Sequence, residues 1–372
     1  MSTRDVSRGW LVTAVVAAVA LVLAAPFVGQ LRTAIRQALG PSFATAIGAA
    51  VAAGIGLAFV YALIRIRDRP IARYGALAAA LAVGVGYALA ARTGNPEVDA
   101  VERFHFVEYG LVTFFFYRAW RPAGDGALIW MPVLAALIVG TCEEWLQWFI
   151  PARVGEARDV LLNLIAIACG LLFSLGLDPP PKITLRLAPA SRRRVASIAV
   201  VALMVFGAFF HSVHLGYEIH DADAGVFRSR YTAEQLAELG DARAARWATT
   251  PPLTWSRLSR EDQYLSEGVS HVQRRNETWD EGNVMASRQE NLILEKYYAP
   301  VLDTPSYISA QGHRWAPAQR ADAESRSGPG YMIYVSDAED YPILIWPKWA
   351  FWLVVAVVAL PLLRVGWRPP TV

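Results

Sequence analysis

Long apolar runs recur along this chain, and no other feature limits its fold as strongly. A run of roughly 17 to 25 apolar residues is enough for one helix to cross a hydrocarbon layer about 30 Å thick. About eight such runs are present, approximately over residues 10–28, 43–64, 71–91, 104–120, 127–145, 160–177, 195–214 and 347–363. The chain is 55% hydrophobic and only 18% charged, which is typical of membrane proteins. We therefore predict an all-α polytopic membrane protein with about eight transmembrane helices.

The Lys and Arg residues predict the side on which each loop lies, because short loops rich in these residues stay in the cytoplasm. With the N-terminus inside, the short cytoplasmic segments hold about 15 Lys and Arg, and the short outer loops hold about six. We expect both termini to be cytoplasmic and residues 215–346 to be extracytoplasmic. The first apolar run could instead be a cleaved signal peptide, since Ala24 and Ala25 resemble a cleavage site.

Residues 215–346 are polar and are numerous enough for one folded domain. Capping and periodicity predict a helix over 232–247 and one long or two consecutive helices over 259–298. Alternation of side chains over 331–335 predicts a strand, with 307–310 as its partner in a small β-hairpin. We expect a mainly helical domain that can carry this hairpin.

Polar side chains also recur at helical spacing within this domain. Glu267, His271 and Arg274 or Arg275 share one helix face. We interpret this face as solvated and stabilised by i, i+4 pairs. Tryptophans are expected to anchor the core, since both cysteines, Cys142 and Cys169, lie in predicted membrane helices and leave the domain without a disulfide. These tryptophans are Trp247, Trp255, Trp279 and Trp315.

A first polar cluster lies at the start of the fourth apolar run. Glu102, His105 and Tyr109 fall within an arc of about 60° on a helix, so one face presents a carboxylate, an imidazole and a phenol. Ionisable groups inside a membrane segment are costly and indicate a functional or pairing role. We expect this face to be turned away from lipid.

A second polar cluster joins the fifth and sixth runs. Glu144 and Gln147 share a helix face, as do Asp159 and Asn163, and Arg153 lies in the connection between the two helices. The topology derived from the Lys and Arg residues places both clusters at the outer end of the bundle. Polar residues at one depth can satisfy each other across neighbouring helices. Either they form a structural network, with Arg153 or Arg103 neutralising Glu144 or Asp159, or they line a pocket open to the outer surface.

These two blocks resemble the VanZ-like family of membrane proteins, named for a protein associated with glycopeptide (teicoplanin) resistance. The resemblance covers about 70 residues, 102–170, and rests on the order and spacing of the motifs. The family core usually has four or five spans, so this chain exceeds the pattern, and Arg158 is not a position that the pattern leads us to expect. The positions that match are Glu102, Arg103, His105, Phe106, Tyr109, Glu144, Gln147, Pro151, Arg153, Asp159 and Asn163.

The resemblance implies a location in the bacterial cytoplasmic (inner) membrane and a VanZ-like core. Together with the apolar runs it gives the following organisation. Residues 1–100 form three N-terminal spans, 101–177 a VanZ-like core of three spans, 178–214 a basic cytoplasmic loop with the seventh span, 215–346 the outer domain and 347–372 the eighth span with a tail. It also implies a cell-envelope role in antibiotic resistance. That role is the binding of a lipid-like or lipid-linked molecule at the outer face, with lowered susceptibility to teicoplanin-type glycopeptides. The residues implied for binding are Glu102, His105, Tyr109, Glu144, Gln147, Arg153, Asp159 and Asn163.

Two other functions stay open. An enzyme could act on a lipid-linked envelope precursor with His105 and either Glu102 or Glu144 as acid and base, since a carboxylate partner raises the basicity of an imidazole. An anchored receptor could bind a protein or a sugar through residues 215–346. His105, Glu144 and Asp159 are suitable metal-ligand types without a diagnostic spacing, so we predict no metal and no cofactor. No basic patch with stacking aromatics is present, so nucleic acid is not an expected partner, and the sequence does not predict the oligomeric state.

Overall fold

The computed structural model describes residues 6–92, 94–150, 153–182, 184–249, 259–327, 334–339 and 341–367. The chain divides into two compact units, each described by itself. The first unit comprises Met1–Leu146, Ala157–Phe209 and Trp352–Val372, and the second comprises Gln147–Glu156 and Phe210–Phe351.

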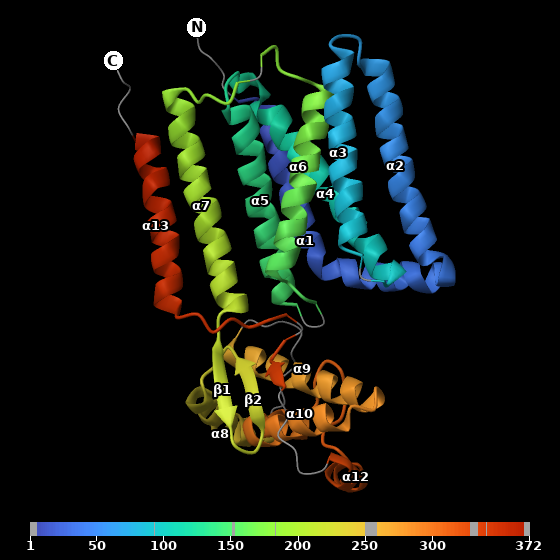
Figure 1. The fold of residues 1–372 in the computed structure, drawn as a ribbon, viewed down its shortest axis with the longest axis vertical. Helices are drawn as coiled ribbons and strands as arrows, with labels where there is room; N and C mark the ends of the chain where they lie inside the picture. The colour runs from blue at the N-terminus through green and yellow to red at the C-terminus, as the bar shows by residue number, and fades with distance from the viewer. Residues whose placement is uncertain are drawn as a thin grey trace. The chain divides into compact units, whose positions relative to one another are not determined.

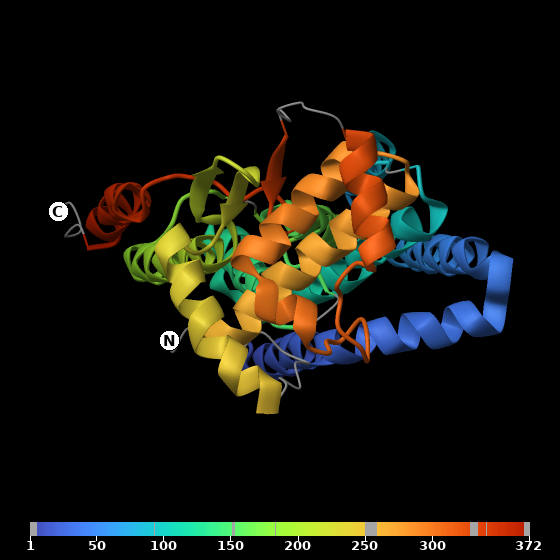
Figure 2. The same cartoon turned by 90° about the horizontal axis from the view of Figure 1, so that it is seen from below.

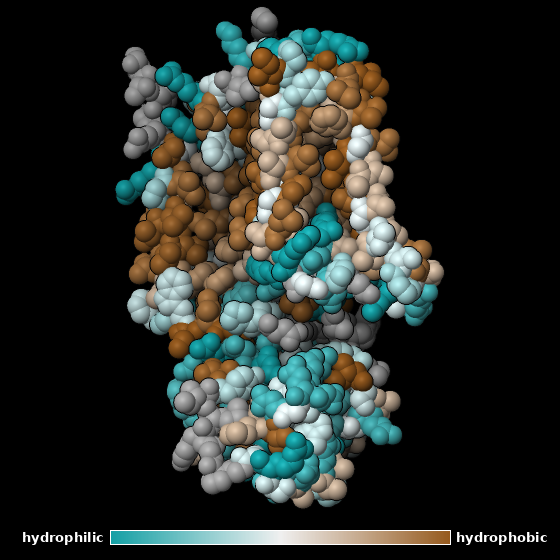
Figure 3. Space-filling model, turned by 45° about the vertical axis from the view of Figure 1, so that its right-hand side comes forward, coloured by the Kyte–Doolittle hydropathy of each residue, from teal (hydrophilic) through white to brown (hydrophobic). Residues whose placement is uncertain are grey.

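Long helices form the first unit (Figure 1), and every predicted apolar run lies in one of them. The helices are α1 (Arg8–Leu39), α2 (Phe43–Arg65), α3 (Pro70–Ala90), α4 (Pro96–Trp120), α5 (Ala127–Trp148), α6 (Ala157–Leu177), α7 (Pro189–His214) and α13 (Lys348–Trp367), with short 3-10 turns at Gly40–Ser42 and Arg121–Ala123. Figure 3 shows hydrophobic surface gathered over the helices of this unit. Six helical stretches in the described part of the chain are long and apolar enough to cross a membrane. The protein is therefore a mainly helical, membrane-embedded protein.

The count of six differs from the predicted eight for two physical reasons. The helices α1 and α2 follow one another through Gly40–Ser42 and form one 58-residue apolar stretch, Arg8–Arg65. The helix α4 carries Glu102, Arg103 and Glu108, and its composition is too polar to count as a membrane span.

The helix α1 changes direction along its length. Its later part lies across the other helices of the first unit (Figure 1), as the view from below also shows (Figure 2). Pro26 lies inside the helix, and a proline removes one backbone hydrogen bond and kinks a helix at that point. Beyond it, Arg32 and Arg36 make the helix more polar. This explains why the apolar run predicted for α1 ends near residue 28.

The helix α4 packs against α6, α1 and α2. Tyr109, Val112 and Tyr117 of α4 are buried, so its apolar part belongs to the core of the unit. The approach to α6 is close at Gly170, where an added Cβ would lie 2.8 Å from the Cα of Gly110. Small residues permit such close contacts between membrane helices.

Arginine side chains hold the end of α6. The buried Arg73 of α3 donates from Nε to the Gly176 carbonyl at 2.8 Å and from a terminal guanidinium nitrogen to the Leu177 carbonyl at 2.6 Å. The last carbonyls of a helix lack partners within the helix. Arg118 of α4 forms an ion pair with Asp178, just beyond α6. These contacts fix α3, α4 and α6 at one end of the unit.

The second unit combines a small sheet with helices. Its strands are β1 (Tyr217–Asp221), β2 (Gly225–Ser229) and β3 (Val335–Asp337), and its helices are α8 (Ala233–Thr249), α9 (Arg260–Asp280), α10 (Val284–Tyr297), α11 (Ala299–Asp303) and α12 (Pro317–Ser327). The sheet order is β1-β2-β3, with β1 antiparallel and β3 parallel to β2. In Figure 2, α9 and α10 lie side by side, in agreement with their packing.

A small β-hairpin is present, but β1 and β2 form it rather than the predicted segments. Val335 begins β3, whose partner is β2, while Tyr331, Met332 and Ile333 lie outside the described residues. The segment 307–310 is not part of the sheet; Ser309 makes an isolated bridge with Ser306. The prediction missed the pairing because β2 and β3 are about a hundred residues apart in the sequence.

The predicted helices of this unit are confirmed. The helix α8 follows Thr232, whose hydroxyl accepts from the Gln235 backbone at 3.3 Å, and α9 begins with a capping box formed by Ser259 and Asp262. Among the tryptophans, Trp247 is 1% exposed and belongs to the core. Trp279 and Trp315 contact each other with ring centroids 5.4 Å apart and are half-buried, and Trp255 lies outside the described residues.

Candidate functional site

An inner polar layer connects α4, α5 and α6 inside the first unit. The Tyr109 hydroxyl of α4 donates to Glu143 of α5 at 3.1 Å. The Asn163 amide of α6 lies 3.5 Å from a carboxylate oxygen of Glu144. Adjacent glutamates on one helix therefore face two different neighbouring helices. All four side chains are buried.

This inner layer is closely packed. An added Cβ at Gly140 of α5, one turn before the glutamates, would lie 3.2 Å from both Tyr109 and Asn163. His105 stacks on Tyr109, with ring centroids 6.1 Å apart and the planes inclined by 6°. Such packing leaves little space for a ligand. The geometry is that of a network that fixes three helices, which is one of the two roles expected for the cluster.

An outer polar layer lies about two turns nearer the start of α4 than Tyr109. Glu102 forms an ion pair with Arg158 of α6 at 3.0 Å. Asp159 follows Arg158 in the first turn of α6, and Tyr87 of α3 lies with Glu102 around one small hollow. Glu102 is 19% exposed and Arg158 is 47% exposed, so this layer is in contact with the surroundings of the unit.

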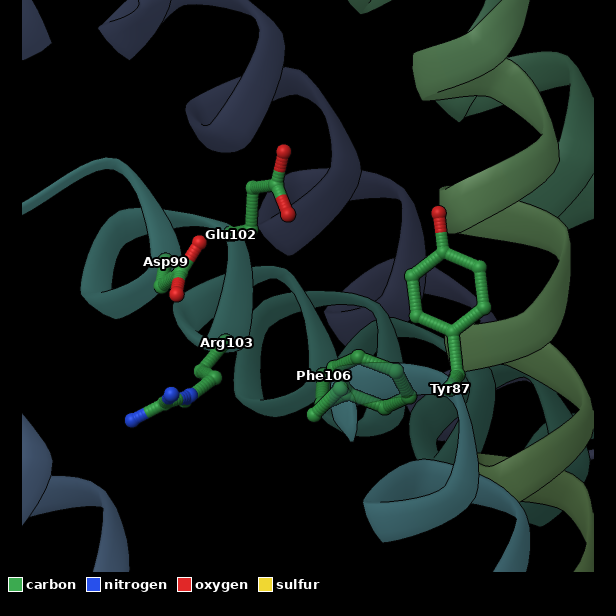
Figure 4. Close-up of a pocket in the computed structure, with 6 residues that line it drawn as sticks. Tyr87, Asp99, Glu102, Arg103 and Phe106 are labelled. Atoms are coloured by element: carbon green, nitrogen blue, oxygen red, sulfur yellow. The ribbon is translucent and has the colours of Figure 1, made fainter. Parts of the chain in front are cut away.

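A small hollow lies beside the outer layer, lined by α3 and α4 (Figure 4). The rings of Tyr87 and Phe106 form its apolar side, with centroids 6.1 Å apart. Asp99 and Glu102 lie on its polar side, and the Arg103 side chain extends away from Glu102. The enclosed space is about 10 Å³, enough for about one water molecule. A larger ligand would have to contact this layer from outside.

Gln147 and Arg153 belong to the second unit. The Arg153 guanidinium donates to the Gln147 amide oxygen at 2.5 Å. The expected neutralisation of Glu144 or Asp159 by Arg153 or Arg103 stays a prediction. The arginine that pairs with the outer carboxylate Glu102 is Arg158. Among the described residues, no three His, Cys, Asp or Glu side chains converge as metal ligands.

Sequence reasoning missed Arg158 and Glu143 as members of the cluster. Arg158 does not match the family pattern, although it lies at the same end of the helices as Glu102. Glu143 lies about 100° from Glu144 on the helix, so helical spacing does not place the two on one face. A helix that packs between two neighbouring helices has two inward faces. A polar residue on either face is therefore a candidate member of the cluster, and this criterion would have included Glu143.

Glu267 and His271 on the polar face of α9 are fully buried, so the prediction that this face is solvated is wrong. Glu267 is fully buried and accepts from the Ser229 hydroxyl at 2.6 Å, the Tyr298 hydroxyl at 2.8 Å and the Arg230 backbone N–H at 3.0 Å. The Arg230 guanidinium pairs with Glu267 at 3.2 Å and with Glu339 at 2.8 Å. Burial alone would lower the pKa of Arg230, but Tyr341 and the two carboxylates outweigh it and hold the pKa well above its usual value.

A second buried group contains His271, Glu290 and Ser336. His271 Nδ1 lies 2.6 Å from Glu290, and the Ser336 hydroxyl donates to the other Glu290 oxygen at 2.7 Å. These residue types occur in hydrolase triads, but there the serine contacts the imidazole nitrogen opposite the one that faces the carboxylate. Here serine and glutamate lie on the same side of the ring, and all three side chains are fully buried. The group is a structural network.

No protein-family model matches this chain, and no curated protein or solved structure is significantly similar to it.

Proposed function

We propose that the protein is a VanZ-like membrane protein of the bacterial cell envelope, which binds a lipid-like or lipid-linked molecule at the outer face of the cytoplasmic membrane. The proposal includes eight membrane crossings, with α1 and α2 as separate spans and α4 as a span buried among its neighbours. It also includes cytoplasmic termini and an extracytoplasmic second unit. One functional consequence would be lowered susceptibility to teicoplanin-type glycopeptides.

The observation that carries this proposal is the partly exposed outer layer above a closely packed inner layer. Glu102 and Arg158 offer charges of both signs at the ends of α4 and α6, beside the aromatic rings of Tyr87 and Phe106. A lipid headgroup with an attached hydrocarbon chain presents the complementary combination of charge and apolar surface. The inner layer keeps the helices that carry these groups in register.

The direct test compares the thermal stability of the purified full-length protein with and without an extract of envelope lipids. We expect Glu102→Gln and Arg158→Gln to unfold near the parent temperature without lipid, because exposed ion pairs contribute little to stability. Both variants should lose the lipid-induced rise in unfolding temperature. Glu144→Gln, in the buried layer, should lower the unfolding temperature whether or not lipid is present. A lipid-induced rise that persists in both outer-layer variants would contradict the proposal.

A cellular test addresses the glycopeptide. We expect expression of the parent protein to reduce susceptibility to teicoplanin, and Glu102→Gln to remove that effect at equal protein abundance. His105→Ala separates the enzyme alternative, because it would abolish turnover of a lipid-linked precursor while leaving the folded protein abundant. Deleting residues 217–346 separates the receptor alternative, in which that deletion would remove the function and His105→Ala would not.

A further inference from the structure

The second unit contains a cavity of about 320 Å³ that the polar clusters of the first unit do not include. Its walls come from distant parts of the sequence: Trp148 at the end of α5, His211 in the last turn of α7, Tyr231 before α8, Arg260 at the start of α9 and Lys348 at the start of α13. This volume lies at the lower end of the range for small-molecule sites. It is large enough for a headgroup but too small for a whole lipid.

Positive charge predominates in this cavity. Arg230, Arg260 and Lys348 line it, and none of the described residues that line it is acidic. The charge of Arg230 is matched by Glu267 and Glu339, so attraction for an anion has to come from the other two cations. Neither Arg260 nor Lys348 forms an ion pair within the part of the chain that the structure describes. Their charges are therefore available to a ligand.

Aromatic rings orient these cations without neutralising them. The Arg260 guanidinium lies 5.6 Å from the Tyr231 ring centroid, and the Lys348 ammonium lies 4.9 Å from that of Tyr217. Contacts of this length are typical of cation–π pairs, which hold a cation in place and leave its charge intact. The two groups are thus positioned at the cavity in advance of a ligand.

The apolar wall is equally well fixed. The Trp148 indole N–H donates to the Tyr341 hydroxyl at 2.8 Å, and the same hydroxyl accepts from Arg230 at 3.1 Å. The Arg230 guanidinium also lies 5.3 Å from the Trp148 ring centroid. An anion site for a free ion has no need of a large aromatic wall. The combination fits an anionic group attached to hydrocarbon.

The position of the cavity along the chain supports a lipid. His211 and Lys348 lie in the end turns of α7 and α13, two helices apolar enough to span a membrane. Residues at the ends of such helices lie at the depth of lipid headgroups, where Trp and Tyr are also enriched. A headgroup can therefore reach the cavity without its chains leaving the membrane.

We propose that this cavity binds the phosphate-bearing headgroup of a membrane lipid or lipid-linked molecule. Arg260 and Lys348 contact the phosphate, and Phe149, which packs on the buried Trp148 and lines the cavity, contacts the adjoining apolar part. The inference deepens the proposed function and rests on it for the presence of such a molecule at this face. It adds a second contact site and a chemical class of ligand.

The test uses the full-length protein in uncharged detergent and three probes: micelles doped with phosphatidylglycerol, micelles doped with phosphatidylcholine, and inorganic phosphate. We expect phosphatidylglycerol to raise the unfolding temperature most, and Arg260→Gln with Lys348→Gln together to weaken its binding by about tenfold or more. The control, Arg320→Gln on α12, removes an exposed charge outside the cavity and should bind like the parent.

Three results would overturn the inference. The first is an equal rise in the unfolding temperature of the parent with phosphatidylglycerol and with phosphatidylcholine. The second is unchanged phosphatidylglycerol binding in the double variant. The third is full competition by inorganic phosphate, which would indicate a site for the free ion. Glu102→Gln, measured beside these variants, separates the two proposals. Loss of phosphatidylglycerol binding in Glu102→Gln but not in the double variant would support the proposed function and refute the cavity. Loss in the double variant but not in Glu102→Gln would support the cavity and refute binding at the outer polar layer.

Discussion

At the scale of single residues, the second unit depends on charges that are buried and fully paired. Glu267 and Arg230 lie in its interior, where an isolated charge would be very unfavourable. Three hydrogen bonds to Glu267 and two carboxylates around Arg230 compensate for the loss of water. Removing one partner from such a pair costs more than the pair itself contributes, because the other charge remains buried.

We therefore expect Glu267→Ala to lower the free energy of unfolding by about 3–5 kcal/mol. Chemical denaturation of the detergent-solubilised protein, followed by tryptophan fluorescence, measures this change. The control is Glu324→Ala on α12, whose carboxylate is 54% exposed and whose loss should cost less than about 0.5 kcal/mol. Similar losses in the two variants would show that Glu267 is not a buried structural charge.

His313 makes stability depend on pH. Its side chain is buried, and burial, followed by the charge of Arg275, lowers the pKa of His313. The unfolded chain, with a histidine pKa of about 6.5, takes up a proton as the pH falls while the folded protein still resists it. The contribution of His313 is therefore complete above about pH 6.5 and is lost as the pH falls toward the folded pKa.

The corresponding measurement is the unfolding temperature between pH 5 and pH 8 for the parent, His313→Gln and His220→Gln. Below about pH 6.5 the free energy of unfolding should fall less steeply with falling pH in His313→Gln than in the parent. The difference in slope is up to about 1.4 kcal/mol per pH unit, and the unfolding temperature should show the same trend. His220, whose side chain is 72% exposed, provides the surface control. A slope that is the same in all three proteins would exclude His313 as its cause.

At the scale of elements, α4 and α6 approach so closely that Gly170 and Gly110 should differ in their tolerance of a larger side chain. An added Cβ at Gly170 would meet the backbone of Gly110, whereas an added Cβ at Gly110 meets nothing within 4 Å. Gly170→Ala should force the helices apart and destabilise the protein by about 1–3 kcal/mol. Gly110→Ala should be tolerated. The unfolding temperatures of the two purified variants give the comparison, and equal temperatures would contradict this packing.

The helices were predictable because their signal is local. Each apolar run in the sequence lies in a helix, since about 20 consecutive apolar residues have few other ways to satisfy their backbone groups in lipid. Thr232 and Ser259 marked the starts of α8 and α9 because capping also depends on near neighbours.

The parts that sequence did not predict depend on distant contacts. Glu267 and His271 have the spacing of a solvated helix face, and only the packing of β2, β3 and α10 against α9 buries them. The pairing of β2 with β3 has the same origin. For the candidate site, helical spacing grouped Glu102, His105 and Tyr109 on one face, but the partners Arg158 and Glu143 follow from how three helices meet.

At the scale of the whole molecule, both proposals require that the outer polar layer and the second unit be extracytoplasmic. In the first unit, the start of α1, the end of α13 and the loops after α2 and α6 lie at one end of the helices (Figure 1). Arg65, Arg67, Arg69 and Lys182 belong to this end. The basic residues support its cytoplasmic placement.

Labelling of single cysteines in intact cells tests this placement most directly. Cys142 and Cys169 both lie within membrane helices, so replacing them with alanine provides a background in which Ser325→Cys on α12 or Lys182→Cys in the loop after α6 is the one thiol. Both positions are exposed. We predict that a membrane-impermeant maleimide labels Ser325→Cys in intact cells and labels Lys182→Cys only after permeabilisation. Labelling of Lys182→Cys in intact cells, with protection of Ser325→Cys, would contradict the extracytoplasmic binding function.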